Sequence, residues 1–583
     1  VLARVHDTLM ALASEPDVRA CYAPAAAGAE QVSLRLVSPL AEGSDRLAAE
    51  SALALGYRLE TPLPFPQPEY ERDFPASIDA FRTLLSRAVT GDGAPAVLAL
   101  DGGRGPDNDA SYRAVGHHVV RNCDLLIAVW NGAPPKAPGG TGDIVRFATR
   151  NGVPVWWIHA TEPTAQPRLI RNPLHLRQPD RAARGDAAEQ DLERLLRHTM
   201  LPPATVAPHR PGVLGQAVHH GCRLFRQQPA PLKDYLHEPP PASRGIWRAY
   251  AWFLDQAAPR PTGPDLHLLP PEDPVETWWE RYYRPADGLS LAYGDRYRSS
   301  YVMIFALAAL ALICASLALV APLVLAVPVI ALELVALLGI SALVLGNHLF
   351  RWHDRWIIYR LLAELCRKQH VLAPLGWSLP VWEVERMAAE ETDHTHGPLP
   401  PRDAWVAWYF TAVLRAAPLP HGALSDATLA RARALGASLM DGQAEYHRVR
   451  YLRSRDAGRR LGLLGEAFFL IMIVVVAAKL WLLLATDAYG VAAWLGLAGA
   501  LLPAPSAAFV GIRAYAEFEL LMHQSARMQR AMAAVRAELD FIDLSRPLAS
   551  QELGAMLNGV AISMMQDVQG WVQLFRVKAL EAG

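Results

Sequence analysis

The chain has 583 residues, a formal net charge of −1, 52% hydrophobic residues and 19% charged residues. A typical soluble domain carries about a quarter charged residues, so the chain is poor in charge, and its apolar content excludes an intrinsically disordered protein. The 56 basic residues are matched by 57 acidic ones, which argues against a nucleic-acid-binding protein that relies on overall basicity. At about 150 residues per domain, the length predicts three or four structural units.

The five cysteines are scattered, and no two of them form a CxxC pair. This usage favours reduced thiols over a disulfide framework or a zinc site. An amphipathic helical pattern starts at the first residue, which is not Met, so we expect further chain upstream of it. The cysteines are Cys21, Cys123, Cys222, Cys314 and Cys366.

Residues 1–160 alternate predicted strands with predicted helices. The strand candidates are residues 32–37, 57–63, 96–100, 124–130 and 153–158. The helix candidates are residues 44–55, 78–89, 111–121 and 142–151. Alternating strands and helices with short connections predict a parallel sheet covered on both faces, an α/β Rossmann-like fold. Ligands of such sheets bind beyond the carboxyl ends of the strands.

Two strand-to-helix turns have the composition of a phosphate-binding site. Residues 38–46 (SPLAEGSDR) follow the first predicted strand, and residues 138–143 (PGGTGD) follow the fourth. Glycine lets the backbone approach a ligand closely, and a helix N-terminus offers free N–H groups to an anion. Either turn can also be an ordinary connection, with Asp45 as a helix cap. The predicted ligand-binding residues are Ser38, Gly43, Ser44, Asp45, Arg46, Asn131, Gly139, Gly140, Thr141, Gly142 and Asp143.

These turns resemble those of a known superfamily. Ser38, Leu40, Ala41, Gly43, Asp45, Ala48, Ala52, Leu53 and Gly56 are similar to the S-x-L-A-x-G-x-D-x-x-A pattern of the DNA-processing DprA family. Residues 138–142 resemble the P-G-G-x-G-T-x-x-E signature of the LOG phosphoribohydrolases. Together they make residues 1–160 resemble the SLOG superfamily of Rossmann-like nucleotide-binding domains. The resemblance implies a nucleotide-derived ligand, such as an ADP-ribose derivative or a cyclic nucleotide, with no metal and no further cofactor.

Departures from the family patterns predict a binding protein and not an enzyme. Asp143 stands where the LOG signature has Thr, Arg146 stands where it has the catalytic Glu, and Pro39 replaces a glycine of the DprA pattern. A membrane-tethered nucleotide N-glycosidase is the first alternative, with Asp143, Asp45 or Glu42 as the working carboxylate. A membrane scaffold that binds a protein partner and no nucleotide is the second.

Four apolar runs have the length of membrane spans, about 20 residues each. They are residues 302–320, 329–350, 461–485 and 491–512. The links within each pair are short, which predicts two hairpins, and Pro503 and Pro505 predict a kink in the last span. Buried helices of a large soluble protein are the alternative.

The basic residues that flank the runs predict the orientation of the hairpins. The links inside the hairpins contain no Lys or Arg, so the positive-inside rule places both links outside and both termini in the cytoplasm. Three ionisable residues within the runs, Glu333, Glu466 and Lys479, either mark a pathway or reach the interface from near the ends of the spans. The flanking residues are Arg296, Arg298, Arg351, Arg355, Arg453, Arg455, Arg459, Arg460 and Arg513.

Each predicted hairpin is followed by an amphipathic segment, residues 351–369 and residues 513–539, which indicates a tandem repeat of a two-span unit. This architecture resembles the SLATT family of two-span proteins. The resemblance implies a pore-forming or membrane-perturbing effector of bacterial anti-phage defence in the inner membrane. Because four spans are too few to enclose a wide pore, we expect homo-oligomers.

The sequence therefore predicts five segments: residues 1–160, a Pro-rich cytoplasmic connector at 161–300, the first two-span unit at 301–380, a cytoplasmic helical region at 381–458 and the second two-span unit at 459–583. A helix is expected at 186–199. Aromatic residues near the first span favour a membrane-interface position, with packing on the sheet domain as the alternative. They are Trp247, Trp252, Trp278, Trp279, Tyr282 and Tyr283.

Two polar segments invite a functional reading, and we prefer a simpler one for each. Residues 393–396 (DHTH) fit a solvated loop better than a metal site, because they offer no third ligand in a held geometry. The basic run at residues 446–460 fits the positive-inside rule better than nucleic-acid binding.

Overall fold

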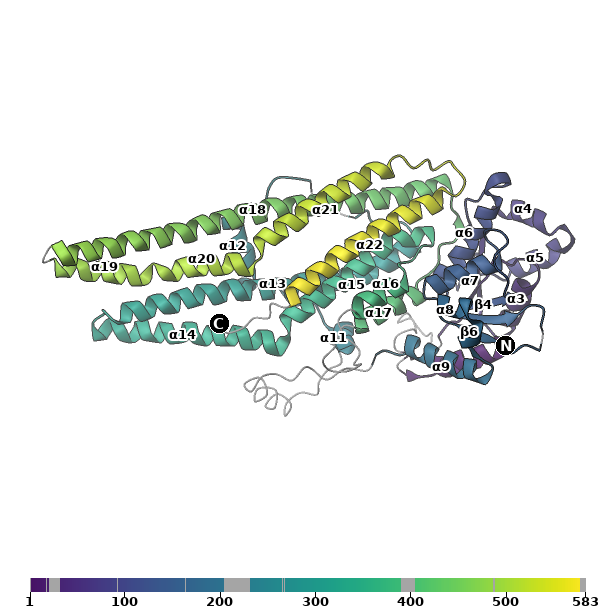
Figure 1. The fold of residues 1–583 in the computed structure, drawn as a ribbon, viewed down its shortest axis with the longest axis horizontal. Coiled ribbons are helices and arrows are strands. Elements are labelled where there is room, and N and C mark those ends of the chain that lie inside the picture. Colours follow the sequence, from purple (N-terminus) through teal and green to yellow (C-terminus); the bar gives the residue numbers. More distant parts are fainter. Residues whose placement is uncertain are drawn as a thin grey trace.

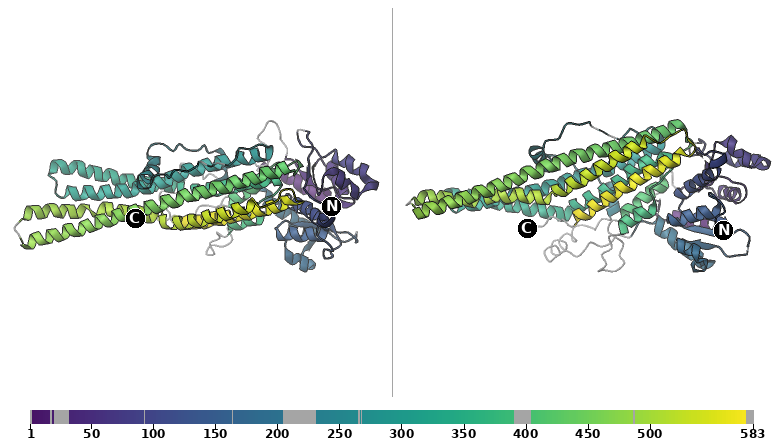
Figure 2. Two further views of the ribbon diagram at one scale, coloured as in Figure 1. Left: turned by 90° about the horizontal axis from the view of Figure 1, so that it is seen from above. Right: turned by 45° about the horizontal axis from the view of Figure 1, so that its top comes forward.

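The computed structural model describes residues 2–16, 18–19, 32–91, 93–162, 164–203, 231–264, 266, 268–389, 404–485 and 488–576. Mixed strands and helices form one end of an elongated molecule, and paired helices form the other end (Figure 1). A bundle of helices lies between them, and both hairpins extend from this bundle in the same direction (Figure 2).

Two sheets make up the N-terminal domain. The first has the strand order β1 (Arg35–Val37), β2 (Arg58–Leu63), β3 (Val97–Ala99), β8 (Gly422–Ala423), and all its pairs are parallel. The second contains the parallel pair of β4 (Leu126–Trp130) and β5 (Val155–His159). Two antiparallel strands, β6 (Arg168–Ile170) and β7 (Ala183–Arg184), extend it. The predicted parallel pairing is thus confirmed within each sheet, but the prediction of a single sheet is wrong, because β1 to β3 and β4 to β5 belong to two separate sheets. Strands β6, β7 and β8 lie beyond residue 160.

Helices separate the strands as the sequence predicts. The main ones are α1 (Leu2–Ala13), α3 (Ser44–Ala54), α5 (Ile78–Leu85), α6 (Asn108–Arg121), α7 (Thr141–Arg150) and α9 (Asp186–Met200). Two short helices, α4 (Gln67–Tyr70) and α8 (Pro173–Arg177), lie in the connections. Apolar side chains of the sheets and helices form separate cores, one around Phe65 and Phe81 and another around Trp156.

Among the described residues, four helices are long and apolar enough to cross a membrane. The first hairpin joins α13 (Pro274–Ala318) to α14 (Leu323–Phe350). The second joins α18 (Asp426–Ala485) to α19 (Tyr489–Leu501) and α20 (Pro503–Tyr515). The break between α19 and α20 at Leu502 agrees with the kink predicted from the following proline. Large apolar side chains stand exposed along these helices, among them Leu323 at 80% and Leu484 at 79%, as expected of surfaces that face lipid.

Each hairpin leads into a helix that packs back on the long helix of its own unit. These are α15 (Trp352–Leu372) on α13 and α21 (Phe518–Leu539) on α18. The predicted tandem arrangement of two hairpins, each with a following helix, is therefore present in the fold. Two continuous helices cross predicted segment boundaries, because α13 runs through residue 300 and α18 runs through residue 458.

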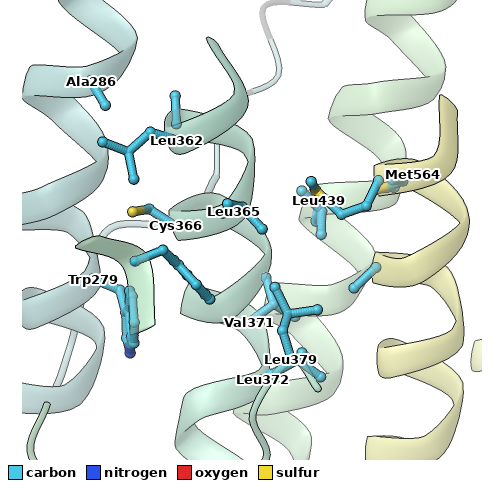
Figure 3. Close-up of a cluster of buried hydrophobic side chains, with 14 of the residues drawn as sticks. Trp279, Ala286, Leu362, Leu365, Cys366, Val371, Leu372, Leu379, Leu439 and Met564 are labelled. Carbon is cyan, nitrogen blue, oxygen red and sulfur yellow. The ribbon is translucent and has the colours of Figure 1, made fainter. Parts of the chain in front are cut away.

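The long helices and their partners enclose the largest core of the molecule. Leu439 and Met564 lie side by side there, and the α15 side chains Leu362 and Leu365 lie between them and the helix that carries Trp279 (Figure 3). The other helices around this core are α11 (Pro231–His237), α12 (Ala249–Ala257), α16 (Val381–Ala389), α17 (Ala404–Ala416) and α22 (Ala549–Arg576).

The preferred interface position is wrong for the aromatic residues at the start of α13. Trp279 is fully buried, and its ring lies 5.7 Å from that of Phe410 on α17. Because α13 is continuous and rises about 1.5 Å per residue, Trp279 lies roughly 35 Å along the helix before residue 302. These side chains therefore pack inside the helical bundle.

Candidate functional site

A cavity of about 1020 Å³ lies between the two sheets. Its walls include residues 32–38, which contain β1, and residues 123–129, which contain most of β4. This volume is at the upper end of the roughly 300–1,000 Å³ of small-molecule sites. The cavity is therefore large enough for a nucleotide-sized ligand.

The strands offer main-chain hydrogen-bonding groups to this cavity. Leu34 and Ser38 bond to β2, and Leu126 and Trp130 bond to β5 or its flanking residues. Because adjacent residues of a strand direct their N–H and C=O groups to opposite sides, the odd-numbered residues face the cavity. None of these odd-numbered groups has a main-chain partner within the described part of the chain. They are Ser33, Arg35, Val37, Leu125, Ile127 and Val129, and all of them line the cavity.

The first predicted turn lies at the carboxyl end of β1. Ser38, Ser44 and Asp45 line the cavity. The Ser38 hydroxyl accepts a hydrogen bond of 3.2 Å from the N–H of Leu40, which has a left-handed φ of 57°. Burial raises the pKa of the Asp45 carboxyl, while hydrogen bonds from the Ala41 main chain and the Ser44 side chain oppose this shift. These bonds hold Asp45 in the turn.

Arg46 faces the protein interior. Its guanidinium donates to the carbonyl oxygen of Leu40 at 3.1 Å and to the Ser77 hydroxyl at 2.9 Å, and it lies 4.5 Å from the centre of the Phe74 ring. Arg46 therefore stabilises the turn through contacts in the protein interior and does not line the cavity. Gly43 has a φ of 100°, which the sharp entry into α3 requires.

The second predicted turn lies at the N-terminus of α7, where Gly139 and Thr141 line the same cavity. Gly139 has a φ of 81°, and a Cβ there would lie 2.7 Å from the main-chain nitrogen of Arg113. The Asp143 carboxylate accepts the N–H of Gly139 at 3.1 Å and pairs with Arg113 at 3.2 Å. Asp143 thus stabilises the turn by accepting a main-chain N–H just before α7, as a capping residue does.

Five of the predicted residues meet around the cavity: Ser38, Ser44, Asp45, Gly139 and Thr141. The other six do not line it. Gly140 is the exposed N-cap of α7, where an added Cβ would meet only the Ala137 carbonyl oxygen at an ordinary 3.5 Å. Asn131 accepts the N–H of Ala133 at 3.1 Å and shapes the loop before the turn. The remaining four are Gly43, Arg46, Gly142 and Asp143.

The candidate catalytic carboxylates have structural partners. Glu42 is exposed and accepts the Ser77 hydroxyl at 2.7 Å. Asp143 holds Gly139 and Arg113 as described, and Asp45 is bonded within its own turn.

The helical bundle supplies one wall of the cavity. This wall was not predicted from the sequence. Trp278, Arg281 and Tyr282 of α13 line the cavity together with Tyr409 and Val413 of α17. The rings of Tyr282 and Tyr409 lie 6.4 Å apart. No local pattern could reveal this wall, since these residues follow the N-terminal strands by more than a hundred positions.

The end of α17 holds the amino ends of β1 and β4 together. The Arg35 guanidinium donates to the carbonyl oxygen of Ala417 at 2.9 Å and to that of Arg415. Arg415 in turn pairs with Asp124 at 2.6 Å. The cavity therefore reaches from the two turns at the carboxyl ends of the strands to the bundle at their amino ends.

Three further contacts join the sheet domain to the bundle. The Arg121 guanidinium of α6 lies 3.4 Å from the centre of the Trp377 ring, close to the end of α15. Strand β8 pairs with β3 only a few residues before α18 begins. The Asp101 carboxylate after β3 accepts the N–H of Ser550 at 2.8 Å and its hydroxyl at 2.5 Å, at the start of α22.

No group of three or more potential metal ligands occurs within the described ranges. Residues 393–396, the segment with two histidines, lie outside those ranges. Cys123, Cys314 and Cys366 are free thiols, whereas Cys21 and Cys222 also lie outside the described residues.

Comparisons of the chain with protein-family models, with curated proteins and with solved structures found no match. The resemblance to SLOG and SLATT proteins therefore rests on the motifs and architecture of the chain alone.

Proposed function

We propose that this protein is a membrane effector controlled by an anionic, nucleotide-derived ligand. One observation carries the proposal. Helix α13 contributes Trp278, Arg281 and Tyr282 to the cavity wall, and the same continuous helix forms the first candidate span. A ligand in the cavity would thus act directly on a helix of the membrane region.

The two helix N-termini favour an anion as the ligand. The start of α3 supplies Ser44 and the start of α7 supplies Thr141 to one cavity. Free N–H groups and the partial positive charge at such ends attract phosphate. A nucleotide-derived signal, as the SLOG resemblance implies, would place its phosphates here and direct its remaining groups along the cavity. The ligand does not include a nucleic acid in this proposal, because the chain has no net basic charge.

Two routes would carry the signal to the hairpins. The first is α13 itself, and the second is β8, which joins the sheet domain to α18 and so to the third candidate span. A ligand can shift the hairpins only if it binds one arrangement of sheet domain and bundle more tightly than another. The cavity allows such a preference, because residues of the sheet domain and residues of the bundle both line it.

The hairpins would open a pore or perturb the bilayer as homo-oligomers. The exposed apolar surfaces of α14 and α18 leave room for lipid and for a second copy. By the positive-inside rule both termini would be cytoplasmic. With the SLATT resemblance, this suggests a bacterial inner-membrane protein of anti-phage defence.

Nucleotide binding by the full chain in detergent tests the ligand assignment. The full chain is required, because β8 and α17 belong to the fold of the sheet domain. A panel of ADP-ribose and cyclic and linear nucleotides is added, and the unfolding temperature is followed. A ligand at 100 times its Kd adds about 2.7 kcal/mol of stability, so a dose-dependent rise is expected. No shift with any member at millimolar concentration would refute the assignment.

A further inference from the structure

The short helix α12 and the 3₁₀ turn before it, Gly245–Arg248, lie against both hairpins. The N-terminal end is tied to the first hairpin. The Ser299 hydroxyl of α13 donates to the carbonyl oxygen of Trp247 at 2.8 Å and accepts the N–H of Tyr250 at 3.2 Å. The Trp247 ring lies 5.0 Å from the ring of Trp352, which starts α15. This end of α12 is therefore fixed where the first hairpin leaves the bundle.

The other end of α12 is tied to the second hairpin. Arg453 of α18 donates to the carbonyl oxygen of Ala258 at 3.0 Å and pairs with Asp255 at 2.5 Å. Arg460, at the start of the third apolar run, reaches the carbonyl oxygen of Gln256 at 3.5 Å. The helix thus bridges the two hairpins, and it crosses between them near the middle of the molecule (Figure 1).

These contacts fix the depth of α12 relative to the candidate spans. Ser299 precedes residue 302 by three positions, which is about 4.5 Å along a helix. Arg460 directly precedes residue 461. The headgroup regions add about 10–15 Å to a hydrocarbon core of about 30 Å, or roughly 5–8 Å on each side. Ser299 and Arg460 therefore fall within the headgroup layer of a bilayer that the hairpins span, whereas Arg453 lies about 10.5 Å before Arg460 along α18 and reaches α12 through its long side chain.

The outer face of α12 has the composition of a membrane interface. Tyr250, Phe253 and Leu254 pack against the bundle core, whereas Trp252 is 66% exposed. Ile246, in the preceding turn, is 56% exposed. Exposed arginines accompany them in the 3₁₀ turn before α12 and midway along α18: Arg248, Arg459 and Arg460. Tryptophan beside basic residues is typical of the headgroup region, where the ring meets the acyl boundary and the cation meets phosphate.

We propose that α12 is an interfacial helix that binds the phosphate headgroups of the bilayer surface and braces the two hairpins against each other. Trp252 and Ile246 enter the headgroup layer, and Arg248, Arg459 and Arg460 contact lipid phosphates. The proposal rests on the membrane insertion of the hairpins, but it does not depend on the ligand. It accounts for two large exposed apolar side chains that the cytoplasmic bundle leaves uncovered.

Fluorescence quenching in vesicles tests this placement. The full chain, with its native cysteines replaced by alanine, carries one environment-sensitive label at Trp252→Cys, Phe541→Cys or Leu332→Cys. Phe541 is 87% exposed in the cytoplasmic connection between α21 and α22, and Leu332 is 46% exposed on α14. The vesicles contain phosphatidylcholine with a headgroup spin label, and a second series contains an acyl-chain spin label.

The label at residue 252 should be quenched by the headgroup spin label at least twofold more than the label at residue 541. The acyl-chain label should quench residue 332 most strongly. If residue 332 is quenched and residue 252 behaves like residue 541, the interfacial helix is refuted while membrane insertion stands. If residue 332 is not quenched either, membrane insertion itself fails.

Anionic lipid tests the phosphate contacts. Adding phosphatidylglycerol should increase headgroup quenching at residue 252, because three arginines face the layer. The double change Arg248→Gln and Arg459→Gln leaves only Arg460, so it should reduce that increase at least twofold and leave quenching in pure phosphatidylcholine unchanged. An increase of equal size in this variant would overturn the assignment of these arginines to lipid phosphate.

Discussion

Arg351 and Glu517 occupy equivalent places in the two halves of the membrane region. Each is a single left-handed residue between the returning helix of a hairpin and the cytoplasmic helix that follows, with φ and ψ of 53° and 43° for Arg351 and 52° and 38° for Glu517. Each is followed by a buried aromatic residue, Trp352 or Phe518. The two units therefore share a backbone joint as well as an order of helices, and the joint lies where each hairpin returns to the bundle.

The left-handed conformation of Glu517 predicts that glycine stabilises the protein at this position, whereas glycine usually destabilises a helix. A residue other than glycine in the left-handed region costs about 1–2 kcal/mol, whereas glycine inside a helix costs about 0.5–1 kcal/mol relative to alanine. Glu517→Gly should therefore unfold at a higher temperature than Glu517→Ala. Two positions later, exposed Glu519 is helical, so Glu519→Gly should unfold at a lower temperature than Glu519→Ala. Thermal unfolding of the four variants in detergent measures both differences, and the same order at both positions would contradict the left-handed joint.

The N-terminus of α7 predicts the effect of a charge added beside the ligand site, because Gly140 stands between Gly139 and Thr141, which line the cavity. Gly140 has an ordinary φ of −71°, and a Cβ there has room, so both Gly140→Asp and Gly140→Ala should fold. The aspartate would engage the free N–H groups and repel an anion, and we expect it to raise the Kd for the ligand found in the nucleotide panel at least tenfold. Gly140→Ala should stay within about threefold of the parent. Equal affinities of the two variants, measured by calorimetry, would show that the ligand does not use this helix end.

The contact between Asp101 and Ser550 predicts how firmly α22 is attached to the sheet domain. The carboxylate satisfies two donors at the start of α22, and Ser550 is fully buried. Asp101→Ala leaves both donors without this acceptor and should cost about 1–3 kcal/mol. Hydrogen exchange should accelerate in the first turns of α22. The control Glu162→Ala removes an exposed loop carboxylate and should leave α22 unchanged; equal acceleration in both variants would argue against a specific anchor.

A buried charge cluster on α15 predicts a rise of stability with pH. Burial lowers the pKa of Lys368 to about 8, although Glu364, 2.5 Å away, favours the charged form. The unfolded chain keeps this proton up to about pH 10.4, so between these values the unfolded state binds more protons and the free energy of unfolding increases with pH.

The variant Lys368→Met removes this contribution. The stability of the parent relative to the variant should therefore rise between pH 7.5 and pH 10, by on the order of 2 kcal/mol. Burial also raises the pKa of the Cys366 thiol, but this residue is common to both proteins and its effect cancels. A difference that stays constant or falls over this range would contradict the lowered pKa of Lys368.

Local patterns predicted the elements of the fold well, because each depends on nearby residues. The alternation of apolar runs with turns located β1 to β5, and composition located the four apolar runs, although α13 and α18 begin 28 and 35 residues before the runs at 302 and 461. The proline break between α19 and α20 follows from the same local chemistry. In contrast, β8 is a two-residue strand that forms by pairing with the edge of β3. Its sequence is too short to contain a pattern that predicts a strand.

The candidate site could be predicted only in part for the same reason. Ser38 and Gly139 belong to turns with recognisable glycine and helix-start signals, and the fold brings them to one cavity. Arg46 carried the same local signal, yet its side chain turns inward to Leu40 and Ser77, which only the packing of α3 on α5 decides. The bundle wall formed by Tyr282 and Tyr409 is a contact between distant segments, which no local pattern contains.

Ion release from liposomes that carry the full chain tests the central claim, that a ligand in the cavity between the sheets controls the hairpins. The measurement compares the parent, Gly140→Asp and Gly140→Ala, each with and without the nucleotide that raises the unfolding temperature. The account predicts ligand-dependent release by the parent and by Gly140→Ala, and none by Gly140→Asp at the same concentration. Release that is independent of the nucleotide, or no release although the nucleotide binds, would contradict it.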